Sequence, residues 1–170
     1  MHKYLTDTEV KKLLKEAEII VDTREKENKH VLDYLEKNKV KTIQRGLKTG
    51  DYSIQLRGMT SENDIVIERK ASIDELCGNL TINRQRFEDE FTRAKANNLQ
   101  IYLLIENCSY TDILSHNYRS KLPPNSLLGS VFSWLARFDV TLIFCKPAES
   151  GRIIYEILYY FLREQLKRGG

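Results

Sequence analysis

Short apolar segments that end abruptly in charged residues are the feature of this sequence that most restricts its fold. The segments EIIVDTRE (18–25) and DIVIERK (64–70) have the composition of strands that end in charge, and QIYLLIE (100–106) is an almost continuous apolar run. Apolar runs of this length are typical of strands that are buried on both faces of a sheet. The sequence therefore predicts a sheet with helices packed on its faces.

Segments with helical spacing alternate with further strands. Thr6 followed by Glu9 is typical of a capping box and predicts a short first helix. The spacing of apolar residues predicts later helices at 30–38, 84–98, 124–138 and 151–168, and further strands at 40–44, 50–58 and 139–145. Because helices and strands alternate along most of the chain, we expect an α/β fold with a mixed sheet.

Length and charge limit the architecture and the partners. At 170 residues, with 41% hydrophobic residues and no Pro/Gly/Ser-rich linker, the chain is expected to form a single domain over residues 1–170. Charged residues make up 30% of the chain, but the net charge is only +3. Any affinity for nucleic acid must therefore come from local basic surfaces.

The cysteines and the lack of long apolar runs indicate the compartment. The three cysteines are an odd number and include no CxxC pair, which argues against a disulfide framework or a zinc cluster. The sequence shows no charged-then-apolar leader and no apolar run long enough to span a bilayer. We therefore expect a soluble protein without a membrane partner, in the reducing cytoplasm or, in a eukaryote, in the nucleus.

The segment 64–70 ends in three consecutive charges that give the first indication of chemistry. Side chains alternate between the faces of a strand, so Glu68 and Lys70 are expected on one face, with Cα atoms about 6.6 Å apart, and Arg69 on the other. An acidic side chain at such a place can hold a divalent metal ion, and a neighbouring lysine can orient or deprotonate the attacking water. The pair therefore suits phosphodiester hydrolysis.

A metal site of this kind needs a second carboxylate, and Asp51 in TGDYS provides one. If the strands at 50–58 and 64–70 are antiparallel, Asp51 at the start of one lies near Glu68 and Lys70 at the end of the other. Taken singly, GDY is more typical of a turn, and ERK of a solvated strand end. A third element is needed to favour a catalytic site.

The segment IIVDTREK supplies that element, because it places Asp22, Arg24 and Glu25 at the end of another apolar strand. The segments VDTRE, GDY and ERKASID, in this order, resemble the nuclease domain of the XPF family of structure-specific endonucleases, within the PD-(D/E)XK superfamily. The resemblance covers residues 18–168. It implies a restriction-endonuclease-like three-layer fold with a central mixed β-sheet flanked by helices. It also implies a DNA endonuclease that uses Mg²⁺ or Mn²⁺ and cuts branched, flap or fork DNA in repair or recombination.

The resemblance further implies roles for individual residues. The metal ligands are expected to be Asp22, Asp51 and Glu68, and Lys70 is expected to position the attacking water. The remaining motif residues are expected to face phosphate or orient carboxylates (Arg24, Arg69) and to support the site as additional acids (Glu25, Asp74).

The helix at 84–98 corresponds to a family helix that carries an arginine and a downstream glutamine. Arg86 occupies the arginine position, but Glu90 stands where glutamine is usual, which leaves the role of Glu90 open. We expect Arg84, Arg86 and Arg93 to contact DNA. The alternative is a surface on which Arg86, Glu90 and Arg93 form salt bridges, because residues three and four apart share a helix face.

Two further residues are not assigned by the motifs. Glu106, which ends the strand at 100–106, is either another acid of the site or a capped strand end. His30, like His2 and His116, is expected at the surface or in a loop.

Two other functions are compatible with the same sequence. One is a catalytically silent nuclease-fold module that binds DNA or a partner chain, although such modules tend to lose acids from the ERK strand. The other is a restriction-type or RNA-directed nuclease with the same core. The helix-hairpin-helix region and the helicase usual in the family are not expected in this sequence, so a preference for one kind of branch is not implied.

The segment RIIYEILYYFLREQLK (152–167) is apolar over much of its circumference. Its apolar arc, at 100° per residue, contains Ile153, Ile154, Ile157, Leu158 and Phe161, and is extended by Tyr155, Tyr159, Leu162 and Leu166. The alternative is a helix that is deeply buried in its own domain. We expect a homodimer through this helix and the helix that contains Trp134, because exposed apolar patches usually mark interfaces.

Overall fold

A mixed β-sheet forms the centre of the molecule. The computed structural model describes residues 5–168. Within them the seven-stranded sheet has the order β2-β1-β3-β5-β6-β7, and the short β4 pairs with β3. The strands are β1 (Ala17–Val21), β2 (Lys41–Gln44), β3 (Tyr52–Leu56), β4 (Met59–Thr60), β5 (Ile65–Lys70), β6 (Gln100–Glu106) and β7 (Thr141–Cys145).

The direction of β3 determines where the ends of the strands meet. β1 is parallel to β2, and β5, β6 and β7 are parallel to one another, whereas β3 is antiparallel to both β1 and β5. The carboxyl ends of β1, β5 and β6 and the start of β3 therefore lie at one edge of the sheet, which we call the carboxyl edge. The antiparallel arrangement that the sequence requires for Asp51 and Glu68 is confirmed.

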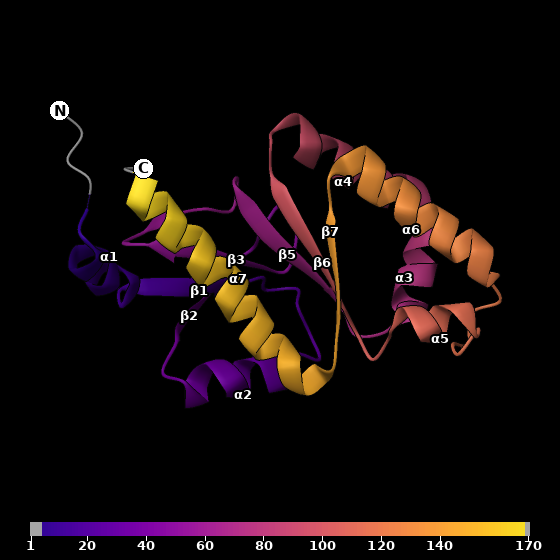
Figure 1. Cartoon of the computed structure of the whole chain (residues 1–170), viewed down its shortest axis with the longest axis horizontal. Helices are drawn as coiled ribbons and strands as arrows, with labels where there is room; N and C mark the ends of the chain where they lie inside the picture. The colour runs from indigo at the N-terminus through magenta and orange to yellow at the C-terminus, as the bar shows by residue number, and fades with distance from the viewer. Residues whose placement is uncertain (1–4, 169–170) are drawn as a thin grey trace.

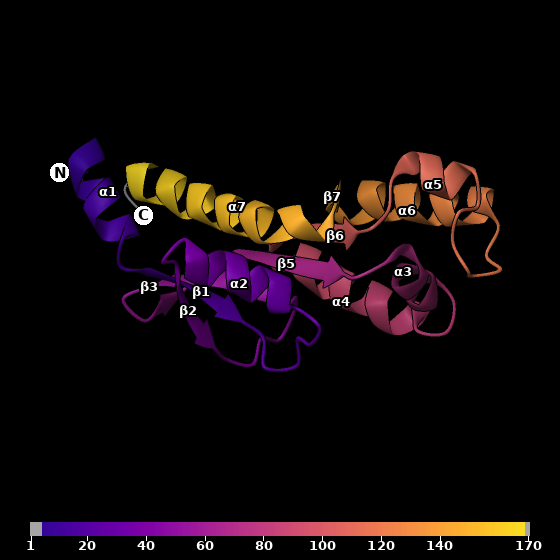
Figure 2. The same cartoon turned by 90° about the horizontal axis from the view of Figure 1, so that it is seen from below.

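Helices cover both faces of this sheet, which confirms the three-layer fold. Figure 1 shows α7 crossing the strands with α2 beside its first half and α1 near its end. Figure 2 shows α3, α4, α5 and α6 gathered at the other end of the molecule. The helices are α1 (Asp7–Leu14), α2 (Lys29–Lys37), α3 (Ile73–Leu80), α4 (Arg84–Ala96), α5 (Tyr110–Leu114), α6 (Pro124–Phe138) and α7 (Pro147–Arg168).

The two faces of the sheet contribute to two hydrophobic clusters. On one face, Ile19, Ile54 and Ile67 pack with apolar residues of α1, α2 and α7. On the other, Val66 and Leu103 pack with apolar residues of α3 to α6. The central strand β5 is therefore buried on both faces, and its side chains are apolar from Ile65 to Ile67, before the strand reaches the carboxyl edge.

Several local predictions hold, and a few boundaries differ. The capping box is present, because the Thr6 hydroxyl accepts the Glu9 N–H and the Glu9 carboxylate accepts the Thr6 N–H. The strand expected at 18–25 ends at Val21, and the charges that follow it lie in a turn. His30, which was expected at the surface or in a loop, is in the first turn of α2, and its side chain is 30% exposed. His2 lies outside the described residues.

No helix described between residues 5 and 168 combines the length and the apolar character that a membrane crossing requires.

Candidate active site at the carboxyl edge of the sheet

The three sequence motifs meet at the carboxyl edge. Asp22 follows β1, Asp51 directly precedes β3, and Glu68, Arg69 and Lys70 end β5. Main-chain bonds fix their spacing, because the Asp22 N–H donates to the Asp51 carbonyl at 2.8 Å. Sheet topology therefore brings together residues that are up to 48 positions apart, from 22 to 70.

A glycine before Asp51 permits this arrangement. Gly50 has a φ of +73°, and a Cβ added to it would lie 2.8 Å from the Val66 Cβ atom. Only glycine adopts this conformation without strain and allows the turn to approach β5 so closely. The Asp51 N–H then donates to the Ile67 carbonyl at 2.8 Å, which sets Asp51 beside the charged end of β5.

Glu68 and Lys70 share one face of β5, as the alternation of a strand predicts. Lys70 Nζ donates to Glu68 Oε1 at 2.7 Å and lies 3.5 Å from Glu75 Oε1. Burial alone would lower the pKa of Lys70, but the carboxylates of Glu68 and Glu75 outweigh it and raise this pKa. Lys70 is therefore charged at neutral pH.

Asp51 is an acid whose pKa is raised although Lys70 is nearby. Its Oδ2 accepts the main-chain N–H of Arg69 at 2.7 Å. Burial, together with the carboxylates of Glu68 and Glu25, raises the pKa of Asp51 to about 8. Two acids thus lie close enough to repel each other at one point, which is the electrostatic condition for binding a cation.

Asp22 has a different environment. Its two carboxylate oxygens accept hydrogen bonds from the Arg24 side chain at 2.9 and 3.1 Å, and Oδ2 also accepts the Leu47 N–H at 2.6 Å. Burial alone would raise the pKa of Asp22, but the bonds from Arg24 and Leu47 lower it. The Arg24 side chain is 66% exposed, and Asp22, with smaller contributions from Asp51 and Glu90, raises the pKa of Arg24.

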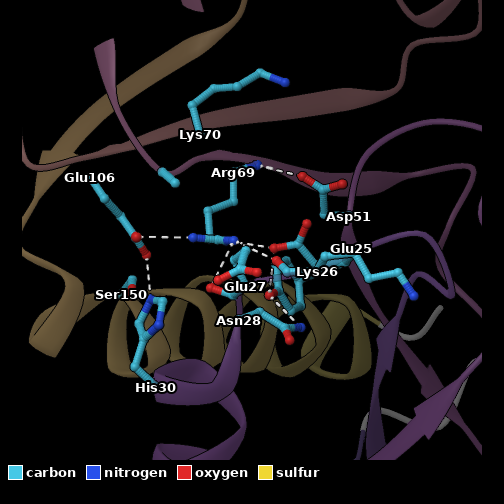
Figure 3. A network of polar contacts seen from close by, with 12 residues as sticks. Glu25, Lys26, Glu27, Asn28, His30, Asp51, Arg69, Lys70, Glu106 and Ser150 are labelled. Carbon is cyan, nitrogen blue, oxygen red and sulfur yellow. Dashed lines mark hydrogen bonds and ion pairs between the residues drawn. The ribbon is translucent and has the colours of Figure 1, made fainter. Parts of the chain in front are cut away.

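Arg69 points away from Lys70, to the other face of β5 (Figure 3). Its Nε donates to Glu25 Oε1 at 2.6 Å, its Nη1 donates to Glu106 Oε2 at 2.9 Å, and its Nη2 donates to the Lys26 carbonyl at 3.1 Å. Burial alone would lower the pKa of Arg69, but Glu25 and Glu106 outweigh it and raise this pKa. Arg69 therefore orients carboxylates, which is one of the two roles expected for it.

A small polar cavity of about 160 Å³ adjoins the Glu68–Lys70 pair, between β5 and the start of α4. The side chains that line it are Glu68, Lys70, Asn79, Asn83, Arg86, Phe87 and Glu90. Among residues 5–168 the exposed Arg86 guanidinium makes no ion pair or hydrogen bond, and Glu90 makes no ion pair with Arg86 or Arg93. The salt-bridged surface considered for this helix is therefore not formed.

Glu90 is a further acid of this region. Burial and the Glu68 carboxylate raise the pKa of Glu90. A hydrogen bond that Glu90 accepts from the Gly50 N–H acts in the opposite direction and lowers this pKa. Glu90 thus joins the turn before Asp51 to the cavity beside Lys70. Helical spacing placed Glu90 on the arginine face of the helix but did not predict its contact with Gly50.

Three other predicted residues lie apart from the Asp51–Glu68 pair. Asp74 accepts the main-chain N–H of Ser120 at 2.7 Å, so it fixes the loop between α5 and α6. Arg84 is paired with Glu88 at 2.9 Å on the surface of α4. Arg93 lines a separate polar cavity with Lys48 and Thr49, next to the turn that contains Gly50.

The acids present fit a divalent cation bound by few protein ligands. Among residues 5–168 no three His, Cys, Asp or Glu side chains are arranged so that they could hold a metal ion by themselves. Mg²⁺ typically binds through one or two carboxylates together with waters and substrate phosphates. The half-buried Asp51 and its neighbour Glu68 provide such a pair, whereas Asp22 would have to leave Arg24 to join them.

Sequence reasoning left the role of Glu106 open and did not connect His30 with the site. Glu106 shares with Glu68 the position of an acid at the end of a buried strand, and this signal left its role open. Glu106 Oε1 lies 2.7 Å from His30 Nε2. No pattern in the sequence pairs His30 with Glu106, because the two are 76 positions apart and meet only through the packing of α2 beside the sheet.

Comparisons with known proteins agree with this geometry. A family model described as the ERCC4 domain matches residues 21–157. Among solved structures, XPF from Aeropyrum pernix is similar, with a TM-score of 0.64 and 21% identity over 86% of this chain and 65% of that chain. The same protein in complex with DNA gives a TM-score of 0.62 and 21% identity, over 87% of this chain and 66% of that chain. This chain thus spans slightly less than two thirds of those structures, and a search of curated protein sequences found no significant match.

Proposed function

This chain belongs to the ERCC4 domain family, and on that premise we propose that it is a divalent-metal-dependent DNA endonuclease that cuts branched, flap or fork DNA. The observation that carries the proposal is the convergence of Asp51, Glu68 and Lys70 at the carboxyl edge. An acid whose pKa is raised by a second acid, beside a charged lysine, suits binding of a cation and of a phosphodiester together.

In this proposal Asp51 and Glu68 hold the cation, Mg²⁺ or Mn²⁺, which when bound offsets negative charge on the scissile phosphate. Lys70 keeps its proton, because its pKa is raised, and it donates a hydrogen bond to the attacking water or to a phosphate oxygen. Lys70 therefore orients the reacting groups and stabilises negative charge, and it does not act as the base.

Arginines around this centre are proposed to hold the DNA backbone. Arg24 is largely exposed and follows β1 at the carboxyl edge, and Asp22 fixes its guanidinium with two hydrogen bonds. Arg86 is exposed beside the cavity that adjoins Lys70. We propose that both arginines contact phosphates, and that Asp22 contributes mainly by holding Arg24 and the Leu47 N–H.

The test is incision of end-labelled flap, fork, Holliday-junction and plain duplex DNA, each with Mg²⁺, with Mn²⁺ and with EDTA. We expect incision near the branch with either metal and none with EDTA. Binding without incision under every metal condition would favour the catalytically silent module instead. RNA of matched sequence is included, because incision of RNA in preference to DNA would favour an RNA-directed nuclease.

Copies of the Asp51→Asn and Lys70→Ala variants, purified in the same way, serve as controls for contaminating nucleases. Incision by the wild-type protein, with none by either variant, would attribute the activity to this site.

A further inference from the structure

A buried charge cluster lies behind the proposed active site and is not explained by metal binding or DNA contact. It contains one guanidinium, of Arg69, and two carboxylates, of Glu25 and Glu106. The side chains of Arg69 and Glu106 are only 3% and 2% exposed, so neither can contact DNA. A buried cluster of this kind persists only when every charge has a partner with good geometry.

Both carboxylate oxygens of Glu106 have a partner within this cluster. Its Oε2 accepts Arg69 Nη1 at 2.9 Å, and its Oε1 lies 2.7 Å from His30 Nε2 (Figure 3). These contacts favour a role through Arg69 over a role as another acid of the metal site.

Arg69 connects Glu106 to the reacting groups in two ways. Its guanidinium holds Glu25 and the carbonyl of Lys26, and so fixes the segment that follows Asp22 and Arg24. Its main-chain N–H donates to Asp51 Oδ2 at 2.7 Å, and its neighbours in β5 are Glu68 and Lys70. The position of Arg69 thus determines the position of one proposed metal ligand directly.

We infer that Glu106 and His30 are positioning residues for the proposed cleavage, acting through Arg69 on Asp51 and on the segment that follows β1. His30 fixes the orientation of the Glu106 carboxylate, and Glu106 holds the Arg69 guanidinium on the face of β5 opposite Lys70. Without Glu106, Arg69 keeps its bonds to Glu25 and to the Lys26 carbonyl but loses the partner of its Nη1, so its guanidinium is held less firmly. The inference rests on the proposed function, because the groups positioned are those assigned to metal binding and cleavage.

The experiment compares Glu106→Ala, Glu106→Gln and His30→Ala with the wild-type protein, each as the 170-residue chain. Three quantities are measured: kcat and KM on flap DNA, the affinity for Mn²⁺ alone by calorimetry, and Tm. Loss of a residue that orients ligands of a metal site typically lowers metal affinity or activity by about 10- to 100-fold. We expect this loss for Glu106→Ala in kcat and in Mn²⁺ affinity, with KM for DNA within about twofold because no DNA contact is removed.

Two further comparisons separate positioning from mere stabilisation. Glu106→Gln keeps an oxygen that accepts from Arg69, so most of kcat and of the Mn²⁺ affinity should be restored. His30→Ala should give a smaller loss, and adding it to Glu106→Ala should change nothing more, because His30 acts only through Glu106. Glu156→Ala, which breaks an exposed ion pair with Arg152 on α7, is the control and should match wild type.

If the wild type is active and Glu106→Ala has the same kcat and Mn²⁺ affinity, whatever its Tm, the inference is wrong but the proposed function stands. If Glu106→Ala does not fold, His30→Ala decides, since its side chain is part exposed, and unchanged kcat and Mn²⁺ affinity in that variant would overturn the inference. A wild type that neither cuts DNA nor binds Mn²⁺ would remove the proposed function and the inference with it.

Discussion

At the scale of single residues, a substitution of Lys70 should affect cleavage and not DNA affinity. Its ammonium group is paired with Glu68 and buried among site residues, so it is not placed to hold the DNA backbone from outside. We predict that Lys70→Ala lowers cleavage by about 10²-fold or more, the usual effect of removing one group that stabilises transition-state charge. DNA affinity measured with Ca²⁺ and the far-UV circular dichroism spectrum should remain close to wild type. Cleavage at the wild-type rate would show that Lys70 has been assigned wrongly.

Asp51 gives a pH-dependent prediction. Its pKa is raised from 3.8 to about 8 in the folded protein, so between these values the folded state keeps a proton that the unfolded state has lost. The free energy of unfolding of the metal-free protein should therefore fall as pH rises from about 4 to 8. Asp51→Asn should abolish cleavage and flatten this pH dependence. It should also raise Tm at pH 8, where each kcal/mol gained in the free energy of unfolding corresponds to about 3 °C for a domain of this size.

The same residue should link pH to metal binding. A cation that binds the folded state stabilises it, and here it must displace the Asp51 proton. The increase in Tm caused by Mg²⁺ should be larger at pH 8 than at pH 6 in the wild type and nearly absent in Asp51→Asn. An equal increase in both proteins would place the cation elsewhere.

Arg86 tests the DNA contact proposed for α4. Each phosphate contact that is lost reduces the slope of log K against log salt by about 0.9. Arg86→Ala should therefore weaken DNA binding and make the salt dependence shallower by about one unit. Arg84→Ala is the matched comparison, because Arg84 is already paired with Glu88 and should change the slope less. If Arg86→Ala leaves the slope of log K against log salt unchanged, Arg86 is a surface residue that does not contact DNA.

The predictability of the site at this scale follows from how local each signal is. The alternation of a strand was enough to place Glu68 and Lys70 on one face and Arg69 on the other. The pairing of Asp22 with Arg24 depends on side-chain rotamers in a turn, and the contact of Glu106 with His30 depends on how α2 packs beside the sheet. Neither rotamers nor helix packing leaves a periodic trace in a sequence.

At the scale of elements, the close approach of α2 and α7 depends on one glycine. A Cβ added at Gly151 would lie 2.6 Å from the Tyr34 Cβ atom. Glycine to alanine inside a helix normally stabilises by about 1 kcal/mol, but overpacking of a tight contact costs about 1–3 kcal/mol. We predict that the clash dominates and that Gly151→Ala lowers the free energy of unfolding measured in urea.

Gly129 in α6 is the matched control for that prediction. A Cβ added there meets nothing within 4 Å, so only the helix propensity remains. Gly129→Ala should therefore leave stability unchanged or raise it by up to about 1 kcal/mol. Equal effects of the two substitutions would show that α2 and α7 can separate without loss.

Most helices and strands were predicted from the sequence, and two of the shortest were not. α4, α6 and α7 have apolar residues at helical spacing over three turns or more, and β6 is a continuous apolar run. The two-residue β4 and the five-residue α5 are too short for any periodicity to be recognised. The end of β1 was placed too late, because charge at a strand end does not distinguish the last strand residue from the first turn residue.

At the scale of the whole molecule, the order of the motifs predicted the architecture better than any single segment did. Asp22, Asp51 and Glu68 meet only if β3 is inserted antiparallel between β1 and β5, and that arrangement is the one found. The sheet order could not be read from the sequence, since hydrophobic patterns give the burial of a strand but not its neighbours.

Assembly is the remaining prediction at this scale. Much of the apolar arc of α7 packs into the core of its own domain, because Ile154, Leu158 and Leu162 are buried against the sheet. Tyr160 is nevertheless 54% exposed, and it borders an open cavity of about 420 Å³ together with Ile157 and Phe161. On α6, which lies at the other end of the molecule (Figure 1), the ring of Phe132 is also exposed and stacks on Tyr110.

We predict that these apolar residues are covered in a homodimer, since exposed patches that include large aromatic side chains usually mark interfaces. Light scattering at micromolar concentration should give twice the 19.9 kDa mass of the chain. Tyr160→Glu should yield a folded monomer, because its ring is exposed and its substitution leaves the core intact. Tyr159→Glu should also split the dimer, although this half-buried ring, 5.4 Å from that of Tyr155, could lower Tm as well. A wild-type mass equal to the monomer at that concentration would contradict the prediction, and a Tyr160→Glu protein that remains dimeric would place the interface on another surface.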